Sequence, residues 1–269
     1  MDGDSALASV RTAHAGDRQF VTALARGLDI LHAFRPGESH LTNREIAART
    51  LLPRPTVSRL THTLTVLGYL VHDPAAEQYR LGAGVLALGY VTLANMGIRQ
   101  VARPYLQEIA DLTRAACALG DHHNLDMIYV ENCRGKDAPF TLGLDVGSRI
   151  PLPNTAMGRA YIAGLDGVER AALFKQLAKH HGKDWPRLLK QLEMSLAAFA
   201  RDGFVVSAAE WMPEINAIGV PIILQESGTV MALNCGGAAS LLSPDMMRKK
   251  IGPKLVAAAR QIEIALRHK

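Results

Sequence analysis

The sequence predicts an α+β protein with a small N-terminal winged helix-turn-helix and a larger C-terminal domain of helices and strands. Three observations support this prediction. Within the first 82 residues, three helical patterns are followed by the pattern of a short β-hairpin. Helical and strand patterns then alternate to the end of the chain. At about 100 to 200 residues a domain, a chain of 269 residues is long enough for two domains that each bury a core.

Composition places the chain among ordinary globular proteins. Hydrophobic residues make up 48% and charged residues 20%, which excludes the disordered, collagen-like and coiled-coil classes. The three cysteines are widely spaced and form no CxxC pair, so we expect neither a disulfide framework nor a zinc site. The N-terminus is acidic where a signal peptide is basic, and no apolar run reaches the length of about 18 residues that spans a bilayer. We expect a cytoplasmic protein without a membrane partner, a metal or a cofactor.

The first predicted element follows an irregular start. Residues 1–18 are small, polar and aperiodic, so we expect a flexible tail there. From Val21 to Phe34, apolar residues recur at helical spacing until Pro36-Gly37 ends the run. The predicted apolar stripe of this helix consists of Val21, Leu24, Ala25, Leu28 and Leu31.

A capping signal marks the second predicted helix. Thr42 lies three residues before Glu45, the spacing at which the two side chains satisfy each other's free backbone N–H groups. This predicts a helix from Asn43 to Arg49. After a break, Pro55 occupies the first turn of a third helix, which ends at Gly68.

A hairpin pattern follows the third helix. Strand patterns at Tyr69–His72 and Gln78–Leu81 flank a turn at Asp73–Glu77. Helix, tight turn, helix and hairpin in this order are typical of a winged helix-turn-helix, which we assign to residues 19–82.

The third predicted helix has one apolar and one polar face. Its apolar stripe is Val57, Leu60, Leu64 and Leu67, which places Arg54 and Arg59 on the other side. Arginine suits both phosphate contacts and bidentate hydrogen bonding to guanine, so we predict DNA binding; a solvated face of a surface helix is the alternative. The predicted DNA-binding residues are Thr42, Arg44, Arg54, Pro55, Thr56, Ser58, Arg59, His62, Thr63 and Arg80.

The rest of the chain predicts a helix at residues 83–97 and a second domain at residues 98–269. The helix at 83–97 is apolar on several sides and must be buried against something. In the second domain we expect helices at Gln100–Ala116, Ala156–Ala163, Val168–Lys179, Trp185–Arg201 and Pro244–Arg267, and strands at Ala118–Leu119, Met127–Cys133, Phe140–Leu144, Phe204–Val206, Ala217–Leu224 and Val230–Asn234.

Three segments resemble the IclR family of bacterial transcriptional regulators. LTNREIAARTLLPRPTVSRLTHTLTVLGYLVHDPAAEQYRLG resembles the DNA-binding domain of that family. RIPLPNTAMGRAYIAGL resembles the segment that enters an early helix of its effector domain, and DGFVVSAAEWMPEINAIGVPI with VMALNCGGAASLLS resembles its last two strands. The resemblance covers about residues 20–265, and the order and separation of the segments make it specific.

The resemblance implies a regulator that is controlled by a small molecule. It implies a GAF-like α/β effector-binding domain, and a dimerisation role for the linker helix at residues 83–97; a core helix of one larger domain is the alternative. The implied partners are double-stranded DNA with a pseudo-palindromic operator, an organic or aromatic acid as effector, and other copies of the chain in a dimer or tetramer. Repressors and activators use the same DNA-binding and effector-binding domains, so the sequence is compatible with either role.

The effector site is expected around the helix that starts near Ala156. Asn154 and Thr155 precede this helix, whose free N–H groups and dipole favour an anion. By resemblance, the pocket is lined by Leu142, Ala156, Met157, Asn216, Asn234, Cys235 and Gly236. We add Trp211 as a stacking or rim residue and Glu214, where the family commonly has glycine, as an acid that favours a polar or cationic effector. Each of these residues has a structural alternative as a helix cap, a buried small hydrophobe or core filling.

The sequence carries no strong enzyme motif. It lacks G-x-S-x-G, the P-loop, H-E-x-x-H and G-x-G-x-x-G, and its two His-His pairs make no chelate. We therefore expect no enzyme. Two alternatives remain open: an enzyme with a helical appendage, for which Cys235 is the candidate nucleophile, and a DNA-binding protein without an effector.

The net charge of +5 is not itself a DNA signal. Residues 1–82 carry nine arginines and eight acidic residues, a balance of only +1, whereas residues 245–269 carry +5. Local placement identifies the predicted DNA surface, through Arg44, Arg49, Arg54 and Arg59.

Overall fold

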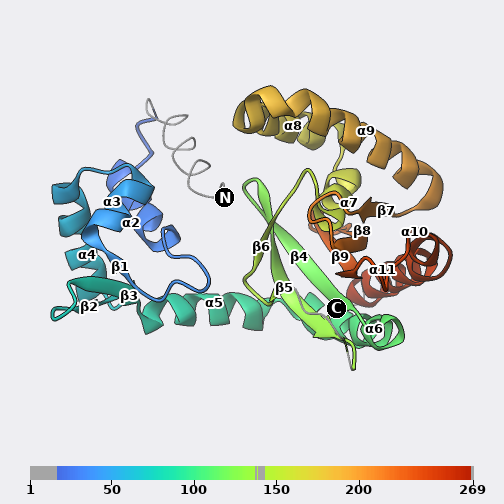
Figure 1. Cartoon of the computed structure of the whole chain (residues 1–269), viewed down its shortest axis with the longest axis horizontal. Helices are drawn as coiled ribbons and strands as arrows, with labels where there is room; N and C mark the ends of the chain where they lie inside the picture. Colours follow the sequence, from blue (N-terminus) through green and yellow to red (C-terminus); the bar gives the residue numbers. More distant parts are fainter. Residues whose placement is uncertain (1–16, 137, 139–142, 268–269) are drawn as a thin grey trace. The chain divides into compact units, whose positions relative to one another are not determined.

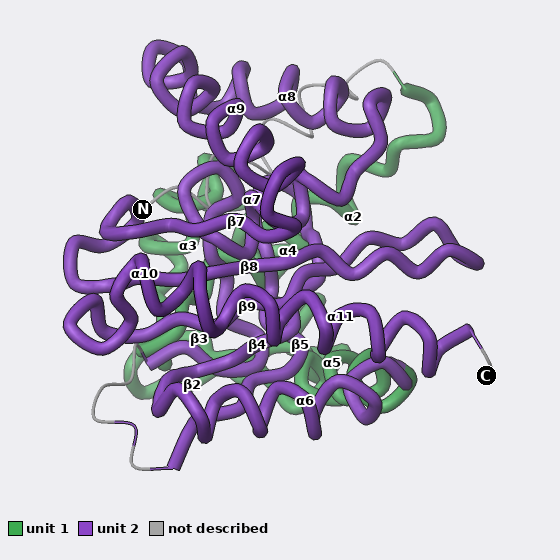
Figure 2. The backbone as a smooth tube through the Cα atoms, turned by 90° about the vertical axis from the view of Figure 1, so that its right-hand side faces the viewer, with its two compact units in different colours: residues 1–95 green, residues 96–269 purple. Residues whose placement is uncertain are grey.

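The computed structural model describes residues 17–136, 138 and 143–267. The chain divides into two compact units, residues 1–95 and residues 96–269 (Figure 2). The predicted tail at residues 1–18 lies almost entirely outside the described residues. No helix among the described residues is long and apolar enough to cross a membrane.

The first unit is a winged helix-turn-helix, as predicted (Figure 1). Its small sheet has the strand order β1-β3-β2, and all its pairs are antiparallel. The sequence did not predict β1, which has only two residues and is too short for a periodic pattern. The elements are α2 (Thr22–His32), β1 (Leu41–Thr42), α3 (Asn43–Thr50), α4 (Arg54–Val66), β2 (Leu70–Asp73), β3 (Gln78–Leu81) and α5 (Ala83–Asn95).

The core of this unit uses a different face of α2 from the one predicted. Leu24 and Leu28 are 63% and 48% exposed, whereas Ile30 is fully buried against α3 and α4. The predicted stripe was therefore wrong at Leu24 and Leu28, which lie on the side away from the two neighbouring helices, whereas Leu31 packs against the core as predicted. The stripe of α4 holds for Val57, Leu60 and Leu64 but not for Leu67, which follows the last turn and is exposed.

The predicted capping box of α3 is present. The Thr42 hydroxyl accepts a hydrogen bond from the Glu45 N–H at 3.2 Å, and the Glu45 carboxylate accepts one from the Thr42 N–H at 2.8 Å. These bonds lower the pKa of Glu45. A lowered carboxyl pKa means that this stabilisation is present above the pKa of the unfolded state and is lost as the pH falls through the folded pKa.

Thr42→Ala is expected to lower the free energy of unfolding by about 1 kcal/mol, because the Glu45 N–H loses the hydroxyl that accepts its hydrogen bond. Chemical denaturation followed by circular dichroism measures this change. Thr92→Ala is the control, since Thr92 is an exposed residue in the last turns of α5 and caps no helix. Equal stability of both variants and the original chain would show that the capping box does not stabilise the fold.

The second unit is built on one antiparallel six-stranded sheet with the order β6-β5-β4-β9-β8-β7. Helices α6 and α11 pack on each other and against one face of the sheet, and α7 packs on the other face, with α8 and α9 outside it (Figure 1). Helices on both faces of one sheet agree with the fold class predicted from the sequence. The elements are α6 (Gly97–Thr113), β4 (Ala116–His123), β5 (Asp126–Arg134), β6 (Arg149–Pro151), α7 (Ala156–Gly164), α8 (Gly167–His181), α9 (Trp185–Asp202), β7 (Val205–Ala208), β8 (Ile215–Leu224), β9 (Thr229–Ala238), α10 (Pro244–Met246) and α11 (Gly252–Leu266).

Two predicted elements of this unit differ in the structure, and one observed strand was not predicted. The final helix is not continuous: a π-helical turn at Met247–Ile251 precedes α11, because Pro253 has no N–H with which to continue the regular helical ladder. Of the strand predicted at Phe140–Leu144, residues 140–142 lie outside the described residues, and Gly143 and Leu144 are not in a strand. Strand β6 was not predicted.

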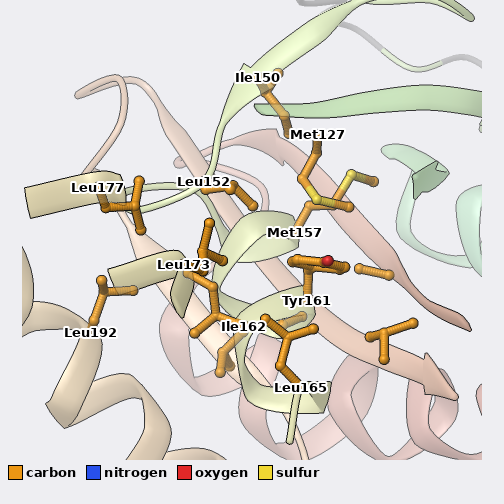
Figure 3. Close-up of a cluster of buried hydrophobic side chains, with 14 of the residues drawn as sticks. Met127, Ile150, Leu152, Met157, Tyr161, Ile162, Leu165, Leu173, Leu177 and Leu192 are labelled. Carbon is orange, nitrogen blue, oxygen red and sulfur yellow. The ribbon is translucent and has the colours of Figure 1, made fainter. Parts of the chain in front are cut away.

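One core of the second unit lies between the sheet and α7, α8 and α9. Met127 of β5 and Met157 of α7 meet at its centre, and Tyr161 and Ile162 continue it along α7 (Figure 3). Helix α7 approaches the sheet closely at Gly219, where a Cβ atom would lie 2.6 Å from the Ala156 carbonyl oxygen. The absence of a side chain there lets the first turn of α7 rest on β8.

Candidate functional site

The described part of the chain presents two candidate surfaces, one in each unit. In the first unit, α3 and α4 carry exposed cationic and polar side chains. Arg44, Arg54 and Arg59 are exposed and form no ion pair with any described residue. Because the core already occupies the other side of α4, these side chains are available to a partner.

Eight of the ten predicted DNA-binding residues lie in two grooves beside α4. The first groove lies between α3, the start of α4 and the β2–β3 hairpin, and it contains Thr42, Arg44 and Arg54. The second lies between α4 and α2, and it contains Thr56, Ser58, Arg59, His62 and Thr63. Pro55 is exposed in the first turn of α4 and Arg80 is exposed on β3, and neither lines a groove.

Arg49 belongs to the fold and not to this surface. Its guanidinium donates to the Ala33 carbonyl oxygen at 2.8 Å and forms an ion pair with Glu38. The same contact lowers the pKa of Glu38. Arg49 therefore ties α3 to the end of α2, and the sequence prediction that counted it with the DNA surface needs correction.

Sequence reasoning missed Arg26 and His72. Arg26 of α2 lines the second groove beside Arg59, and His72 of β2 lines the first and stacks on Tyr79 at 4.6 Å between ring centroids. Arg26 could have been found from the sequence, because it does not belong to the apolar stripe of the first predicted helix and was therefore expected to be exposed. His72 had no such signal, because a single histidine in a hairpin is common.

The second surface is a cavity on the α7 face of the large sheet. The empty volume of this cavity is about 640 Å³, which includes space that is open to solvent. Residues from all six strands of the sheet, the first residues of α7 and the segments before β6 and after β7 enclose it. Its lining residues are Ala116, Ala118, Tyr129, Asn132, Arg134, Leu144, Ile150, Thr155, Ala156, Ser207, Trp211, Ile215, Ala217, Asn234 and Gly236.

Five residues predicted for the effector site line this cavity. They are Thr155, Ala156, Trp211, Asn234 and Gly236. Thr155 also caps α7 as predicted: its hydroxyl accepts from the Gly158 N–H at 3.1 Å and donates to the Pro151 carbonyl oxygen at 2.7 Å. Thr155 is both the cap of α7 and a lining residue, so the beginning of α7 lies at the cavity.

The other predicted residues lie elsewhere. The Asn216 amide donates to the Leu242 carbonyl oxygen at 2.8 Å, and Cys235 lies 3.6 Å from the Thr113 hydroxyl of α6, because both strand residues point to the opposite face of the sheet. Met157 is in the core, and Asn154 and Glu214 are not among the lining residues. Leu142 lies outside the described residues.

A β-bulge brings two missed residues to the cavity. Asn132 pairs with Ala118 and Tyr129 pairs with Gly120, so one extra residue of β5 lies between these two pairs. Without the bulge, Tyr129 and Asn132 would face opposite sides of the sheet, because successive residues of a strand alternate between its two faces. No pattern in the sequence predicts this irregularity.

The polar groups of the cavity are placed by hydrogen bonds. The Asn234 amide donates to the Tyr129 hydroxyl at 3.4 Å, and burial raises the pKa of Tyr129 to about 12, so this hydroxyl stays protonated near neutral pH. Asn132 and Arg134 both donate to the Leu144 carbonyl oxygen at 3.0 Å. Arg134 also pairs with Asp145, yet its side chain is 44% exposed.

A buried arginine fixes two walls of the cavity. Arg159 of α7 is 2% exposed and donates to the Pro153 carbonyl oxygen at 2.9 Å, just before Thr155. It also forms an ion pair at 2.8 Å with Glu210, the neighbour of Trp211. No sequence pattern indicates this role, because a single arginine in a helix is usually on the surface.

Arg159→Met is expected to lower the free energy of unfolding of the second unit by about 2 kcal/mol, because it removes the hydrogen bonds that the buried guanidinium donates to the Pro153 carbonyl oxygen and to the Glu210 carboxylate. Urea denaturation followed by tryptophan fluorescence reports on this unit, since Trp185 and Trp211 are the two tryptophans of the chain. Arg201→Met is the control, because Arg201 is 73% exposed and pairs with its neighbour Asp202. A similar small loss in both variants would contradict the role of Arg159.

Comparison with known proteins identifies two family models. "IclR helix-turn-helix domain" matches residues 23–74, and "Bacterial transcriptional regulator IclR C-terminal" matches residues 90–264. Together they cover both candidate surfaces, and the second alone covers more than half of the chain.

Individual proteins are similar over nearly the whole chain. The Pca regulon regulatory protein of Pseudomonas putida is 31% identical over 93% of this chain and 86% of its own length. The crystal structure of an IclR family transcriptional regulator from Brucella abortus is 40% identical, covers 93% of this chain and 94% of its own, and has a TM-score of 0.85. An IclR homologue from Microbacterium hydrocarbonoxydans, solved with 4-hydroxybenzoate, is 22% identical over 92% of this chain and all of its own, with a TM-score of 0.72; it shares the fold.

Proposed function

This chain belongs to the IclR family of bacterial transcriptional regulators, and from that premise we propose which residues bind DNA and what kind of effector controls them. It is a DNA-binding transcriptional regulator. The observation that carries the residue-level proposal is the exposed face of α4 inside a winged helix-turn-helix, where Arg54 and Arg59 form no ion pair with any described residue.

We assign DNA recognition to α4 and its two grooves. In a helix-turn-helix the second helix enters the major groove, and its exposed side chains contact base edges. Arg54 and Arg59 supply the bidentate donors, while Ser58 and His62 are short enough to reach bases or phosphates. Arg26 and Arg44, on the neighbouring helices, suit phosphate contacts that orient the domain.

The cavity of the second unit suits a small organic acid. Arg134 and the capped start of α7 favour a carboxylate, and Ile150, Trp211 and Ile215 give apolar walls. Glu214 does not line the cavity, which removes the reason for preferring a cationic ligand. The 4-hydroxybenzoate in a structural neighbour of low identity makes aromatic acids a starting point for a screen.

We also propose that two copies of the chain join through α5. This helix has no buried residue, and Leu86, Tyr90 and Val91 are 75%, 69% and 56% exposed. Exposed apolar patches of this kind mark interaction surfaces. A second copy is the partner that fits, because a helix-turn-helix regulator with two-fold symmetry reads two half-sites of a pseudo-palindromic operator.

The enzyme alternative finds little support in the cavity. Cys235, its candidate nucleophile, is fully buried on the α6 side of the sheet and does not line the cavity. Its neighbours there are the Thr113 hydroxyl and Cys117, which pairs with it across β4 and β9. Neither residue is a general base for the thiol.

Footprinting of the full-length protein on the DNA upstream of its own gene tests the DNA role. We expect a protected site with two similar halves about one or two helical turns apart. Raising the salt concentration is expected to weaken binding steeply, because phosphate contacts release counterions. Uniform protection of any DNA, with no preferred site, would contradict sequence-specific recognition by α4.

A further inference from the structure

Two asparagines of the cavity each keep a buried oxygen without a hydrogen bond. Asn132 and Asn234 both line the cavity, and the Oδ1 atom of each accepts nothing from any described residue. The two residues flank Ala118, with which each of them pairs on its own side of β4. Buried polar atoms in proteins are nearly always bonded. Two such oxygens at one cavity therefore point to a donor that the protein itself does not supply.

The orientation of the Asn132 amide is fixed by its neighbour. Its Nδ2 donates to the Leu144 carbonyl oxygen at 3.0 Å, and a carbonyl oxygen can only accept. Turning the amide over would place two acceptors against each other. Asn234 lacks this constraint, because its partner, the Tyr129 hydroxyl, can donate as well as accept. Asn132 is thus the firm acceptor of the pair.

We propose that Asn132 Oδ1 accepts a hydrogen bond from a hydroxyl group of the effector and thereby selects hydroxylated acids over the same acids without the hydroxyl. The inference rests on the proposed function, namely that the effector binds in this cavity. It adds the residue that sets specificity and the functional group that this residue recognises.

The neighbouring residues suit an acid that carries both a carboxylate and a hydroxyl. Arg134 lies two residues after Asn132 on the same face of β5, and both side chains donate to the Leu144 carbonyl oxygen at 3.0 Å, so a cation lies beside the free Asn132 oxygen. Ala116, Ala118 and Gly236 form a floor of small residues beside them. The flat apolar part of the acid would lie on this floor, with its carboxylate toward Arg134 and its hydroxyl toward Asn132.

Calorimetric titration of the full-length protein with matched acids tests the proposal. The probes are 3- and 4-hydroxybenzoate, benzoate, and the 3- and 4-methoxybenzoates, which keep the oxygen but cannot donate. We expect at least one hydroxylated acid to bind about tenfold or more tightly than both its unsubstituted and its methoxy analogue, because a buried acceptor is left unpaired in those complexes. The original chain alone gives this result, so it does not depend on the folding of a variant.

Variants then assign the preference to one residue. Asn132→Leu is expected to bind the hydroxylated and unsubstituted acids within about twofold of each other, since no acceptor remains. Gln225→Leu, a change of an exposed amide in the turn between β8 and β9, is the matched control and should keep the preference of the original chain.

Three results would overturn the inference. Equal binding of hydroxylated and unsubstituted acids by the original chain shows that the orphan oxygens hold only water. An unchanged preference in a folded Asn132→Leu variant assigns the selection to another residue. If none of the acids binds, the acidic effector of the proposed function fails and the inference fails with it, whereas the first two results leave that function standing.

Discussion

Arg59→Ala is expected to weaken operator binding by about 1 to 3 kcal/mol for each bound copy of the chain, which corresponds to about 5- to 150-fold. Arg59 is exposed on α4 and has no ion pair among the described residues, so its guanidinium is free to bind a base edge or a phosphate. The fold should not change, because the core of the unit lies on the other side of α4. Fluorescence anisotropy with labelled operator DNA measures the change.

The salt dependence of this variant distinguishes the two possible contacts. Loss of a phosphate contact lowers affinity for all sequences and reduces the slope of log affinity against log salt by about one. Loss of a base contact relaxes specificity at one position of the site. Arg187→Ala, at an exposed position of α9 in the second unit, is the control. Equal loss of affinity in both variants would point to net charge instead of α4.

Leu86→Asp together with Tyr90→Asp is expected to produce a monomer whose operator affinity falls by more than 100-fold. The two residues lie four apart on α5, so they share one side of the helix. Burying two new carboxylates against a second copy would cost several kcal/mol. A monomer reads only one half-site and therefore loses the contribution of the second DNA-binding unit.

Sedimentation equilibrium gives the mass of this variant, and anisotropy gives its DNA affinity. Val168→Asp is the control, because Val168 is 81% exposed at the start of α8 and the substitution adds the same charge to another apolar surface position. A double variant that keeps both the oligomeric mass and the affinity of the original chain would show that α5 is not the interface.

Much of the first unit could be predicted because its signals are local. The capping box of Thr42 and Glu45 and the proline at the start of α4 involve residues within one helical turn. The buried face of α2 was missed for the opposite reason. Leu24 and Leu28 are as apolar as Ile30, and only the positions of α3 and α4 determine which side is covered.

The cavity was predicted only in part, because sheet geometry decides which residues face it. Period-two alternation separates Asn234 from Cys235, but the sequence does not say which of the two faces α7. Tyr129 and Asn132 reach the same side through a bulge. Arg159 is buried because partners distant in the sequence surround it, Ser195 from α9 and Glu210 after β7.

Effector control requires that an acid in the cavity of the second unit changes DNA binding by the first. Operator affinity of the full-length protein, with and without the tightest-binding acid from the calorimetric titrations, measures this directly. A saturating acid is expected to shift the affinity by at least about fivefold in either direction, and Asn132→Leu is expected to reduce this shift at the same acid concentration. An acid that binds the cavity and leaves operator affinity unchanged would show that the cavity does not control DNA binding.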